Sequence, residues 1–381
     1  MYRRNNNLYL SVILIAVLLF SFMTIYAASS TKNSSRTLGV SARSATLYEP
    51  ETKSFLYEKN ADVRMPMAST TKIMTAIVAL ENSELDDTVE IDDSAIGVEG
   101  SSAYLKQGDV LTMEELLYAL MLGSANDAAV AIACHVGGDV PGFADMMNEK
   151  ALELGLSDTH FTNPHGLDDE EHYTTAHDLA LIAAAALKND TFKSISSTYK
   201  KSFITEERRR TYVNHNKLLN LYEGSIGMKT GFTKKSGRCL VGAAERDGLT
   251  FITVTLNAPD DWNDHGEMLD YGYERLEKIT FADESEHRYD IKVLDGVCES
   301  VDVSNTDSCS VIVERGEHKV EEYVKLPRFV TAPINAGDIL GEIIYTLDGE
   351  AVGSVRLVAE ETVEKKEEKD FFDKIFSIFT G

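Results

Sequence analysis

The stretch MPMASTTKIMTAIVAL, residues 65–80, decides how this chain begins its helical part. Pro66 and two hydroxyl residues, Ser69 and Thr70, stand just ahead of the apolar run IMTAIVAL, which begins at Ile73. Proline favours the first turn of a helix, and Ser or Thr side chains cap helix N-termini. We therefore predict a helix that is capped at this point and ends near Asn82.

Strand-like segments from both ends of this region enclose its helices. The expected elements are hairpins over 45–62 and 239–257, helices over most of 112–190, and a closing helix over 263–278. The hairpin turns are placed at Glu49 to Lys53 and at Asp247-Gly248, a strong hairpin signal. Helices between strands of both chain ends predict an α+β domain with an antiparallel sheet, over residues 38–282.

The pattern changes after residue 284 to short strands, RYDIKVL, SVIVERG, VEEYVKL, DILGEIIYTL and AVGSVRLVA. Turn signals at Asp295-Gly296 and Asp348-Gly349 separate them. Residues 285–359 therefore predict a small all-β domain. The charge-dense segment 360–370, EETVEKKEEKD, is predicted to be a solvated linker.

The final segment, residues 371–381 (FFDKIFSIFTG), places its large apolar side chains on one face of a helix. Such a face either docks on the protein or lies in a membrane interface. Because a charged linker precedes it, we favour the interface. We expect this amphipathic helix to bind a membrane surface.

The first 28 residues indicate export. Arg3 and Arg4 precede the uncharged apolar run 8–28, which ends in small residues as secretory signals do. The run also approaches the length that spans a bilayer, so an uncleaved anchor is the alternative. Both interpretations place the rest of the chain, from the polar leader 29–37 onward, at the outer face of the cytoplasmic membrane or beyond it.

The composition excludes several classes of protein. Of 381 residues, 43% are hydrophobic and 26% charged, which is typical of a globular chain and unlike collagen or a disordered protein. The 62 acidic and 37 basic residues give a formal net charge of -25. Such a charge repels a phosphate backbone, so we expect no nucleic acid partner.

Four cysteines are too few to build a disulfide scaffold. Cys134 and Cys239 lie in apolar runs and are predicted to be buried packing thiols. Cys298 and Cys309 either close a small loop in an oxidising compartment or remain free, and the sequence does not decide between these states.

Several histidines and one tryptophan are candidates for a site outside the motifs. The histidines of residues 160–177 are spaced unlike any zinc signature, so we interpret them as loop and packing residues. We predict no metal and no cofactor. Trp262 is interpreted as an anchoring aromatic in the core or at a rim, with a place at the rim of a substrate site as the alternative.

Three short motifs carry candidate chemistry. They are Ser69-Thr-Thr-Lys72, Ser124-Ala-Asn126 and Lys229-Thr230-Gly231. In the first, a helical turn brings an amine to a hydroxyl whose proton it can take. In the second, a hydroxyl and a carboxamide can relay a proton and bind an amide. In the third, the lysine cation can bind a carboxylate, and the exposed backbone of the strand edge can pair with an extended peptide. Each motif alone also fits a helix cap, a loop or a surface turn.

Together and in this order, the motifs are those of penicillin-binding proteins and class A β-lactamases. The surrounding text resembles the D-alanyl-D-alanine carboxypeptidases among the low-molecular-weight penicillin-binding proteins. The stretches that carry the resemblance are MPMASTTKIMTA (65–76), GSANDAAVAIA (123–133), FTNPHGLDDEEHYTTAHDLA (161–180), NHNKLLN (214–220) and GMKTGFTKKSGRCLVGAA (227–244). The resemblance implies a β-lactamase/transpeptidase-like fold, an antiparallel sheet with a helical subdomain.

The resemblance also implies the roles of the reacting groups. Ser69 is the nucleophile that attacks the carbonyl between two D-alanines, and Lys72 is its base. Ser124 passes a proton toward the leaving D-alanine. The backbone N–H groups of Ser69 and Phe232 form the oxyanion hole.

The remaining motif residues are implied to bind substrate. Asn126 would hydrogen-bond the amide on the acyl side, while Lys229 and Thr230, in the motif that ends at Gly231, would receive the terminal carboxylate. The implied activity is removal of the terminal D-alanine from peptidoglycan stem pentapeptides through an acyl-enzyme, in cell wall biogenesis. The implied partners are the stem peptide and β-lactam antibiotics.

Two alternatives accompany this interpretation. A β-lactamase of the same fold needs a carboxylate that activates water; Glu170 and Glu171 lie in the right part of the chain, but their surroundings match the carboxypeptidases. A non-catalytic wall-binding scaffold would use the β-rich domain, which in residues 336–359 resembles the domain that often follows this catalytic domain.

The chain departs from the pattern of some relatives at two positions. Those relatives carry His where this chain has Phe232, and Arg where it has His215.

Overall fold

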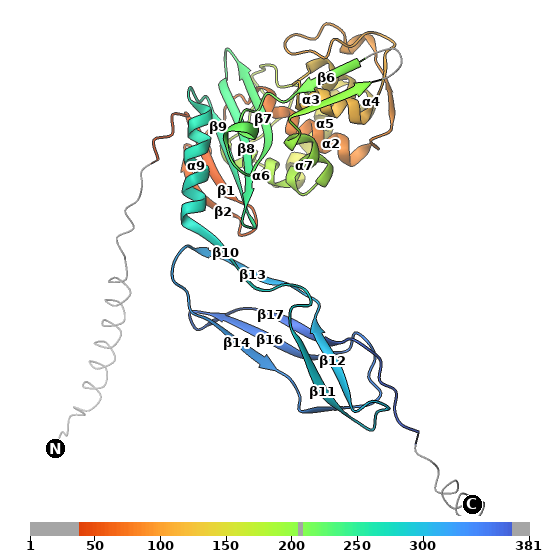
Figure 1. Ribbon diagram of the computed structural model, residues 1–381. Coiled ribbons are helices and arrows are strands. Elements are labelled where there is room, and N and C mark those ends of the chain that lie inside the picture. Colours follow the sequence, from red (N-terminus) through yellow and green to blue (C-terminus); the bar gives the residue numbers. More distant parts are fainter. Residues whose placement is uncertain (1–37, 205–208, 368–381) are drawn as a thin grey trace, which may run out of the picture. The chain divides into compact units, whose positions relative to one another are not determined.

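The computed structural model describes residues 38–204 and 209–367 (Figure 1). The signal-like run 1–28, the leader 29–37 and the tail 371–381 lie outside the described residues, so their predictions stand on the sequence alone. Within the described ranges, no helix is long and apolar enough to cross a membrane.

A five-stranded antiparallel sheet in the order β2-β1-β9-β8-β7 forms the centre of the first domain. Its strands are β1 (Ser44–Glu49), β2 (Ser54–Lys59), β7 (Ser225–Thr233), β8 (Gly237–Arg246) and β9 (Leu249–Leu256). Both predicted hairpins are confirmed, since β1 pairs with β2 and β8 with β9. Strand β1 also pairs with β9, so the sheet is assembled from the two ends of the domain, as predicted.

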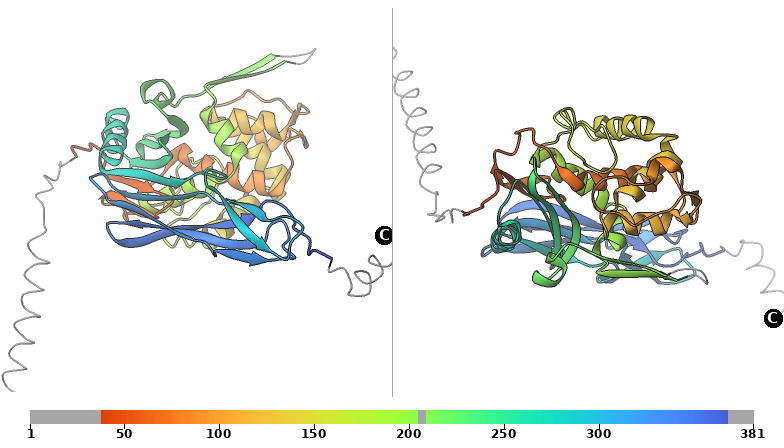
Figure 2. Two further views of the ribbon diagram at one scale, coloured as in Figure 1. Left: turned by 60° about the horizontal axis from the view of Figure 1, so that its bottom comes forward. Right: turned by 90° about the horizontal axis from the view of Figure 1, so that it is seen from above.

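Successive side chains of β9 point to opposite faces of this sheet, and a different layer of helices packs on each face. Thr253 and Thr255 face helix α9 (Asp261–Arg275), where the fully buried His265 lies between them, 2.7 and 2.9 Å from their hydroxyls. Ile252 and Val254 belong to the main hydrophobic core with the other helices. Figure 2 shows the teal helix α9 on one side of the sheet and the orange and yellow helices on the other.

The predicted helical region is confirmed. The helices are α2 (Lys72–Asn82), α3 (Met113–Met121), α4 (Asn126–Gly137), α5 (Val140–Glu153), α6 (Ala176–Leu187), α7 (Asp190–Ser197) and α8 (Leu218–Leu221), with short turns η1 (Ala68–Thr71) and η2 (Asp93–Ala95). Two small hairpins accompany them, β3 (Thr88–Glu90) with β4 (Val110–Thr112) and β5 (Lys200–Ile204) with β6 (Arg209–Val213). Neither of these small hairpins was predicted.

The predicted cap of the first helix is wrong. Ser69 and Thr70 lie in turn η1, and no side chain caps the first residue of α2. Thr70 Oγ1 donates instead to the carbonyl of Met67 at 2.6 Å. The hydroxyl of Ser69 is thereby left for another partner.

The predicted closing helix is three residues too long. Helix α9 ends at Arg275, and β10 (Leu276–Ala282) follows and pairs with β13 (Cys309–Glu314). Residues 276–278 pair with residues 312–314, more than 30 positions further along the chain. The helical periodicity of a short segment gives no information about a strand partner so far away.

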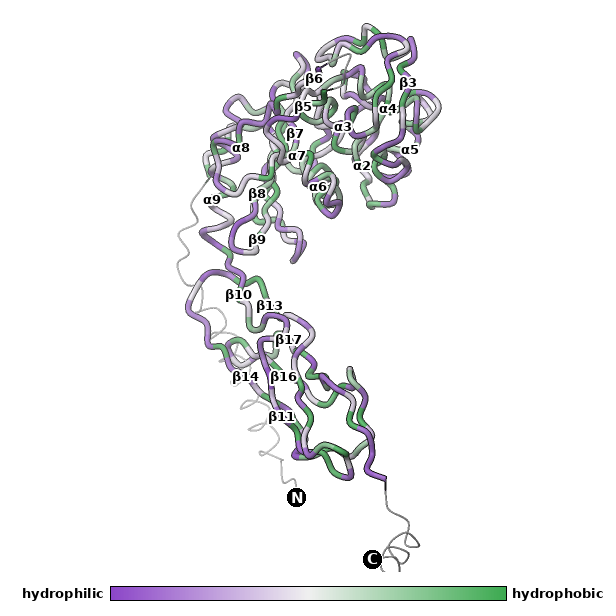
Figure 3. Tube along the Cα trace, turned by 45° about the vertical axis from the view of Figure 1, so that its right-hand side comes forward, coloured by the Kyte–Doolittle hydropathy of each residue, from purple (hydrophilic) through white to green (hydrophobic). Residues whose placement is uncertain are grey.

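The β-rich C-terminal domain is confirmed as a six-stranded sheet in the order β14-β16-β17-β12-β11-β15. Its strands are β11 (Arg288–Leu294), β12 (Ser300–Asn305), β14 (Val320–Lys325), β15 (Phe329–Thr331), β16 (Ile339–Leu347) and β17 (Glu350–Ala359). Strands β12 and β15 were not predicted. Polar and apolar residues alternate along β11 and β12. Hydrophilic and hydrophobic residues both occur along this domain (Figure 3), and its buried hydrophobic residues form a separate core.

All four cysteines are free thiols. Cys239 is buried, as predicted, whereas Cys134 is only half-buried. Cys298 is exposed and Cys309 half-buried, and no disulfide closes the loop between them.

Candidate active site

Ser69 lies where the chain enters helix α2. Turn η1 precedes the helix, and Ala68 at its start has a left-handed φ of 48°. Lys72 Nζ lies 3.0 Å from Ser69 Oγ. The spacing of the motif thus produces the predicted pair of hydroxyl and amine, across the junction of a turn and a helix.

The amine of Lys72 is fully buried among polar groups. Its Nζ is 2.7 Å from Asn126 Oδ1 and 2.6 Å from the carbonyl oxygen of His165. Burial, and then the charge of Lys229, lowers the pKa of Lys72 well below its usual value. A neutral amine has two N–H groups, which match the two carbonyl oxygens, and one lone pair. That lone pair is left for the proton of Ser69.

Residues 163–166, with the sequence NPHG, support the turn from behind. Thr75 Oγ1 donates to the carbonyl of Pro164 at 2.6 Å, and the next carbonyl receives the Lys72 amine. Gly166 has a φ of +89°, and a Cβ there would lie 1.9 Å from the carbonyl oxygen of Ala68. Only glycine lets this segment approach the turn so closely.

The second motif forms the opposite wall, between α3 and α4. Ser124 has a left-handed φ of 56° and is 6% exposed, with its side chain at the pocket. Backbone strain of this kind is common at functional sites. The N–H of Asn126 donates to the carbonyl of Ser101 at 2.7 Å, and its Nδ2 donates to that of Glu99 at 2.5 Å. Asn126 therefore positions Lys72, a contact that the sequence did not predict.

The third motif lies on β7, the edge strand of the sheet. Lys229 is buried and donates from Nζ to the carbonyl of Thr230 at 3.0 Å. Burial lowers the pKa of Lys229 to about 7. A Cβ on Gly231 would lie 2.9 Å from the backbone nitrogen of Ser69, so the absent side chain lets β7 pass beside the nucleophile. Phe232 follows Gly231 on β7, so it comes directly after the residue that passes Ser69, which is the position that the predicted oxyanion hole requires.

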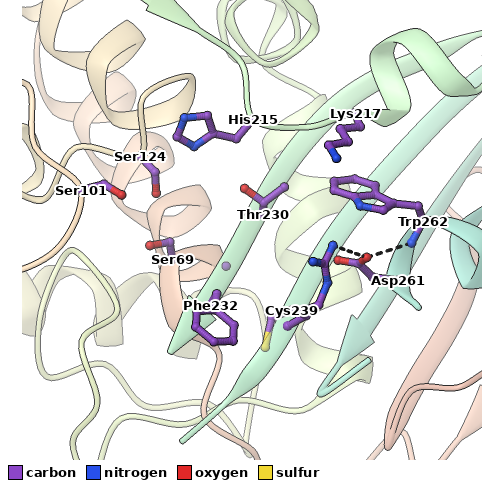
Figure 4. Close-up of a pocket in the computed structure, with 12 residues that line it drawn as sticks. Ser69, Ser101, Ser124, His215, Lys217, Thr230, Phe232, Cys239, Asp261 and Trp262 are labelled. Atoms are coloured by element: carbon purple, nitrogen blue, oxygen red, sulfur yellow. Dashed lines mark hydrogen bonds and ion pairs between the residues drawn. The ribbon is translucent and has the colours of Figure 1, made fainter. Parts of the chain in front are cut away.

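A pocket of about 550 Å³ opens over these groups. Figure 4 shows Ser69 and Ser124 on one side of it, Thr230 across from them, and His215 and Phe232 at opposite ends. The side chain of Phe232 is 67% exposed. Lys72 and Lys229 are buried behind the lining.

Beyond β7 the pocket continues over residues that the motifs did not predict, Lys217 and Arg238. Arg238 Nη2 donates to Asp261 Oδ1 at 2.6 Å, and its guanidinium lies 5.7 Å from the ring centre of Trp262. Trp262 is half-buried and lines the pocket, so it is both an anchor and part of the rim. Arg238 is the partner of Phe232 in the β7–β8 hairpin. Pairing of these two strands in the sequence would have placed Arg238 beside the third motif.

The histidines of residues 160–177 belong to the supporting loop and its neighbourhood. The amide of Thr162 donates to His172 Nδ1 at 3.0 Å, so the other ring nitrogen donates to Thr71 Oγ1, 2.8 Å away. Burial lowers the pKa of His172 to about 4, which keeps the ring neutral. Across residues 38–204 and 209–367, no group of three His, Cys, Asp or Glu side chains is placed to hold a metal ion.

Residues 30–260 match the family described as D-alanyl-D-alanine carboxypeptidase. The chain belongs to this family. Residues 276–365 match the family described as penicillin-binding protein 5, C-terminal domain. The chain is therefore a serine hydrolase of the low-molecular-weight penicillin-binding protein class, and the family favours a carboxypeptidase over the β-lactamase and scaffold alternatives.

Similar proteins of known name match along most of their length. D-alanyl-D-alanine carboxypeptidase DacF of Bacillus subtilis is 31% identical over 93% of this chain and 94% of its own. DacC of Escherichia coli is 30% identical over 94% of this chain and 92% of its own. Both span the catalytic and the β-rich domains.

Solved structures confirm the predicted fold class. Penicillin-binding protein 5 of Haemophilus influenzae has a TM-score of 0.62 and 27% identity, over 86% of this chain and 98% of its own. The Streptomyces K15 DD-transpeptidase has a TM-score of 0.58 and 36% identity, over 61% of this chain and 97% of its own.

Substitution of Gly166 by alanine is expected to slow acylation of this carboxypeptidase by penicillin at least tenfold, because the new Cβ would push the Ala68 carbonyl and displace Ser69. Gly155→Ala is the matched control: its φ is +76°, but nothing lies within 4 Å of the added Cβ. Both variants share a backbone cost of about 1–3 kcal/mol. Acylation is measured with labelled penicillin and stability by thermal unfolding. Equal acylation rates in the two variants would contradict the role of this close approach.

Proposed function

We propose that this carboxypeptidase removes the terminal D-alanine from peptidoglycan stem pentapeptides by way of an ester on Ser69. The observation that carries the proposal is the buried amine of Lys72, 3.0 Å from Ser69 Oγ, with a lowered pKa. A neutral amine at this distance can take the hydroxyl proton as the oxygen attacks the peptide carbonyl.

The later steps use the other walls of the pocket. The backbone N–H groups of Ser69 and Phe232 would stabilise the negative oxygen of the tetrahedral intermediate. Protonated Lys72 returns its proton through Ser124 to the leaving nitrogen, and the C–N bond breaks. Water then attacks the ester, Lys72 accepts its proton and passes it to Ser69 Oγ as the ester bond breaks, and the tetrapeptide leaves with a new carboxylate.

The test is digestion of a disaccharide pentapeptide by the purified protein, followed by mass spectrometry. The expected product has lost one alanine. In parallel, the protein is mixed with penicillin and its intact mass is followed; a long-lived penicilloyl-enzyme is expected. Rapid turnover of penicillin with an unchanged pentapeptide would instead establish the β-lactamase alternative.

Binding of the terminal carboxylate by Lys229 predicts a pH dependence. The pKa of Lys229 is about 7, so its cationic form is lost as the pH rises through 7. KM for a D-alanyl-D-alanine peptide is therefore expected to rise about tenfold from pH 7 to 8.5. The same peptide with a C-terminal amide has no carboxylate to bind and should show no such rise. Parallel pH profiles for the two peptides would exclude Lys229 as the carboxylate ligand.

We also propose that the enzyme works at the outer face of the cytoplasmic membrane, attached through residues 371–381. The apolar pattern of this segment and the export signal in residues 1–28 support the proposal. Each buried apolar side chain contributes roughly 1.5–3 kcal/mol, and apolar attachment survives high salt. Deletion of residues 371–381 is expected to release the protein from the membrane fraction with full peptidase activity. Retention of the shortened protein would identify run 8–28 as the anchor.

A further inference from the structure

Helix α4 begins with Asn126 and continues with Asp127, a carboxylate that lies outside the three motifs. Asp127 is only 2% exposed, and its neighbour Asn126 accepts a hydrogen bond from the Lys72 amine at 2.7 Å. We propose that Asp127 is a positioning residue of the reaction, whose negative charge stabilises the cation that Lys72 becomes while Ser69 attacks. This inference rests on the proposed role of Lys72 as the base.

The carboxylate of Asp127 is fixed in place by hydrogen-bond donors. It accepts four hydrogen bonds, from Ser102 Oγ at 2.6 Å and from the backbone amides of Ala103 at 2.9 Å, Ala128 at 2.9 Å and Leu105 at 3.1 Å. Donors of this kind favour the ionised form of a carboxyl group. The first turn of a helix, where Asp127 lies, favours a negative charge as well. The buried side chain is therefore an anion held at one position.

The charge of Asp127 is not neutralised by a cation in contact with it. All four of its donors are uncharged groups, and no ion pair with Asp127 forms among the residues that the structure describes. A buried charge acts over a longer range than an exposed one, because little water screens it. Burial and then the charge of Lys229 lower the pKa of Lys72, and the charge of Asp127 opposes them. Asp127 and Lys72 thus interact through the interior of the site.

The other titratable groups around the Lys72 amine are cationic or neutral. Lys229 on β7 is a cation below pH 7, since burial lowers its pKa to about 7. His165 and His172 are neutral rings, because burial lowers their pKa values to about 3 and about 4. Among these groups Asp127 alone is an anion. Removal of its charge should therefore change the protonation of Lys72 in one direction only.

The charge matters at one stage of the reaction. Ser69 Oγ forms its bond to the carbonyl carbon while its proton moves to Lys72 Nζ, so that a buried neutral amine becomes a buried cation. This change is unfavourable beside a second buried lysine, Lys229. The fixed carboxylate of Asp127 offsets part of the cost as the charge develops. When the proton passes on through Ser124 to the leaving nitrogen and the C–N bond breaks, the amine is neutral again.

The test is the pH profile of acylation by penicillin, measured between about pH 4 and pH 9. Asp127→Asn removes the charge and nearly keeps the volume. Asp178→Asn is the matched control, because Asp178 is also a buried carboxylate in the first turn of a helix, α6, and accepts hydrogen bonds from the amide of Asp158 and the hydroxyl of Thr159. Ser102→Ala is the second control, since it removes a hydrogen bond to Asp127 and keeps the charge.

Wild-type acylation is expected to rise with pH and level off as Lys72 becomes neutral. Asp127→Asn should lower the pH of half-maximal acylation by about one unit, because the cation loses stabilisation. It should also lower the plateau rate roughly three- to tenfold, because the base is weaker. Asp178→Asn and Ser102→Ala should leave the half-maximal pH unchanged. Thermal unfolding verifies that each variant is folded, and Asp127→Ser, uncharged and smaller, replaces Asp127→Asn if the amide prevents folding.

Three results would contradict these expectations. An unchanged half-maximal pH in the uncharged variant, even at a reduced rate, would overturn the inference and leave Asp127 with a purely structural role. An equal downward displacement in Asp178→Asn would overturn it as well, since the effect would then not depend on the site. Wild-type acylation that does not rise with pH would instead refute Lys72 as the base, on which the proposed function rests.

Discussion

Replacement of Ser69 by alanine is expected to abolish both penicillin labelling and release of D-alanine. The pocket also contains the buried hydroxyl of Ser124, but the lysine amine that accepts the proton lies 3.0 Å from Ser69 Oγ. Without this oxygen no ester can form, and no other group replaces a missing nucleophile. Labelled penicillin on a denaturing gel and chromatography of free D-alanine measure the two losses.

The fold should survive this change, because it removes one oxygen from a side chain at the pocket. Thermal unfolding within a few degrees of the wild type is the control. A label that persists in Ser69→Ala, mapped by peptide mass to Ser124 or elsewhere, would refute the assignment of the nucleophile.

Replacement of Lys72 by alanine is expected to slow acylation by a factor on the order of 10²–10⁴, the usual contribution of a general base. The amine also donates to Asn126 Oδ1 and to the carbonyl of His165, so a modest loss of stability, about 1–3 kcal/mol, should accompany the change. The acylation rate constant is measured with a chromogenic β-lactam, and stability by chemical denaturation.

Lys72→Arg distinguishes a base from a fixed charge. A guanidinium stays protonated at all relevant pH values and cannot take a proton, so this variant should be as slow as Lys72→Ala. In the wild type only the neutral amine is active, and burial lowers the pKa of Lys72. Acylation should therefore increase as the pH rises through that lowered pKa and then level off. A fast arginine variant would show that the charge, and not the base, matters.

Local patterns determined much of this protein from the sequence alone. The Asp247-Gly248 turn fixes the β8–β9 hairpin, and the spacing of Ser69 and Lys72 fixes the distance between hydroxyl and amine. Both depend only on neighbours a few residues away, where backbone geometry is decisive. The same reasoning found the β-rich domain through its short strand-like segments and the turn signals between them.

The errors occurred where distant partners outweigh local preference. Residues 276–278 continue a helical pattern, yet they form β10 because β13 offers them a pairing edge. Thr70 was expected to cap a helix, but its hydroxyl bonds to Met67 within a turn that β7 and residues 163–166 hold in place. Strand pairing and close packing of this kind depend on contacts that no short window contains.

Only the tertiary structure decided the chemistry of the site. Asn126 and His165 are 54 and 93 residues away from Lys72 in the sequence and accept hydrogen bonds from its amine, while burial and the charge of Lys229 lower its pKa. The catalytic pocket, lined by Ser101, Thr230 and Trp262 among others, likewise joins distant segments. A motif specifies which groups are present, but a pKa and a cavity depend on everything packed around those groups, because burial removes water from all sides at once.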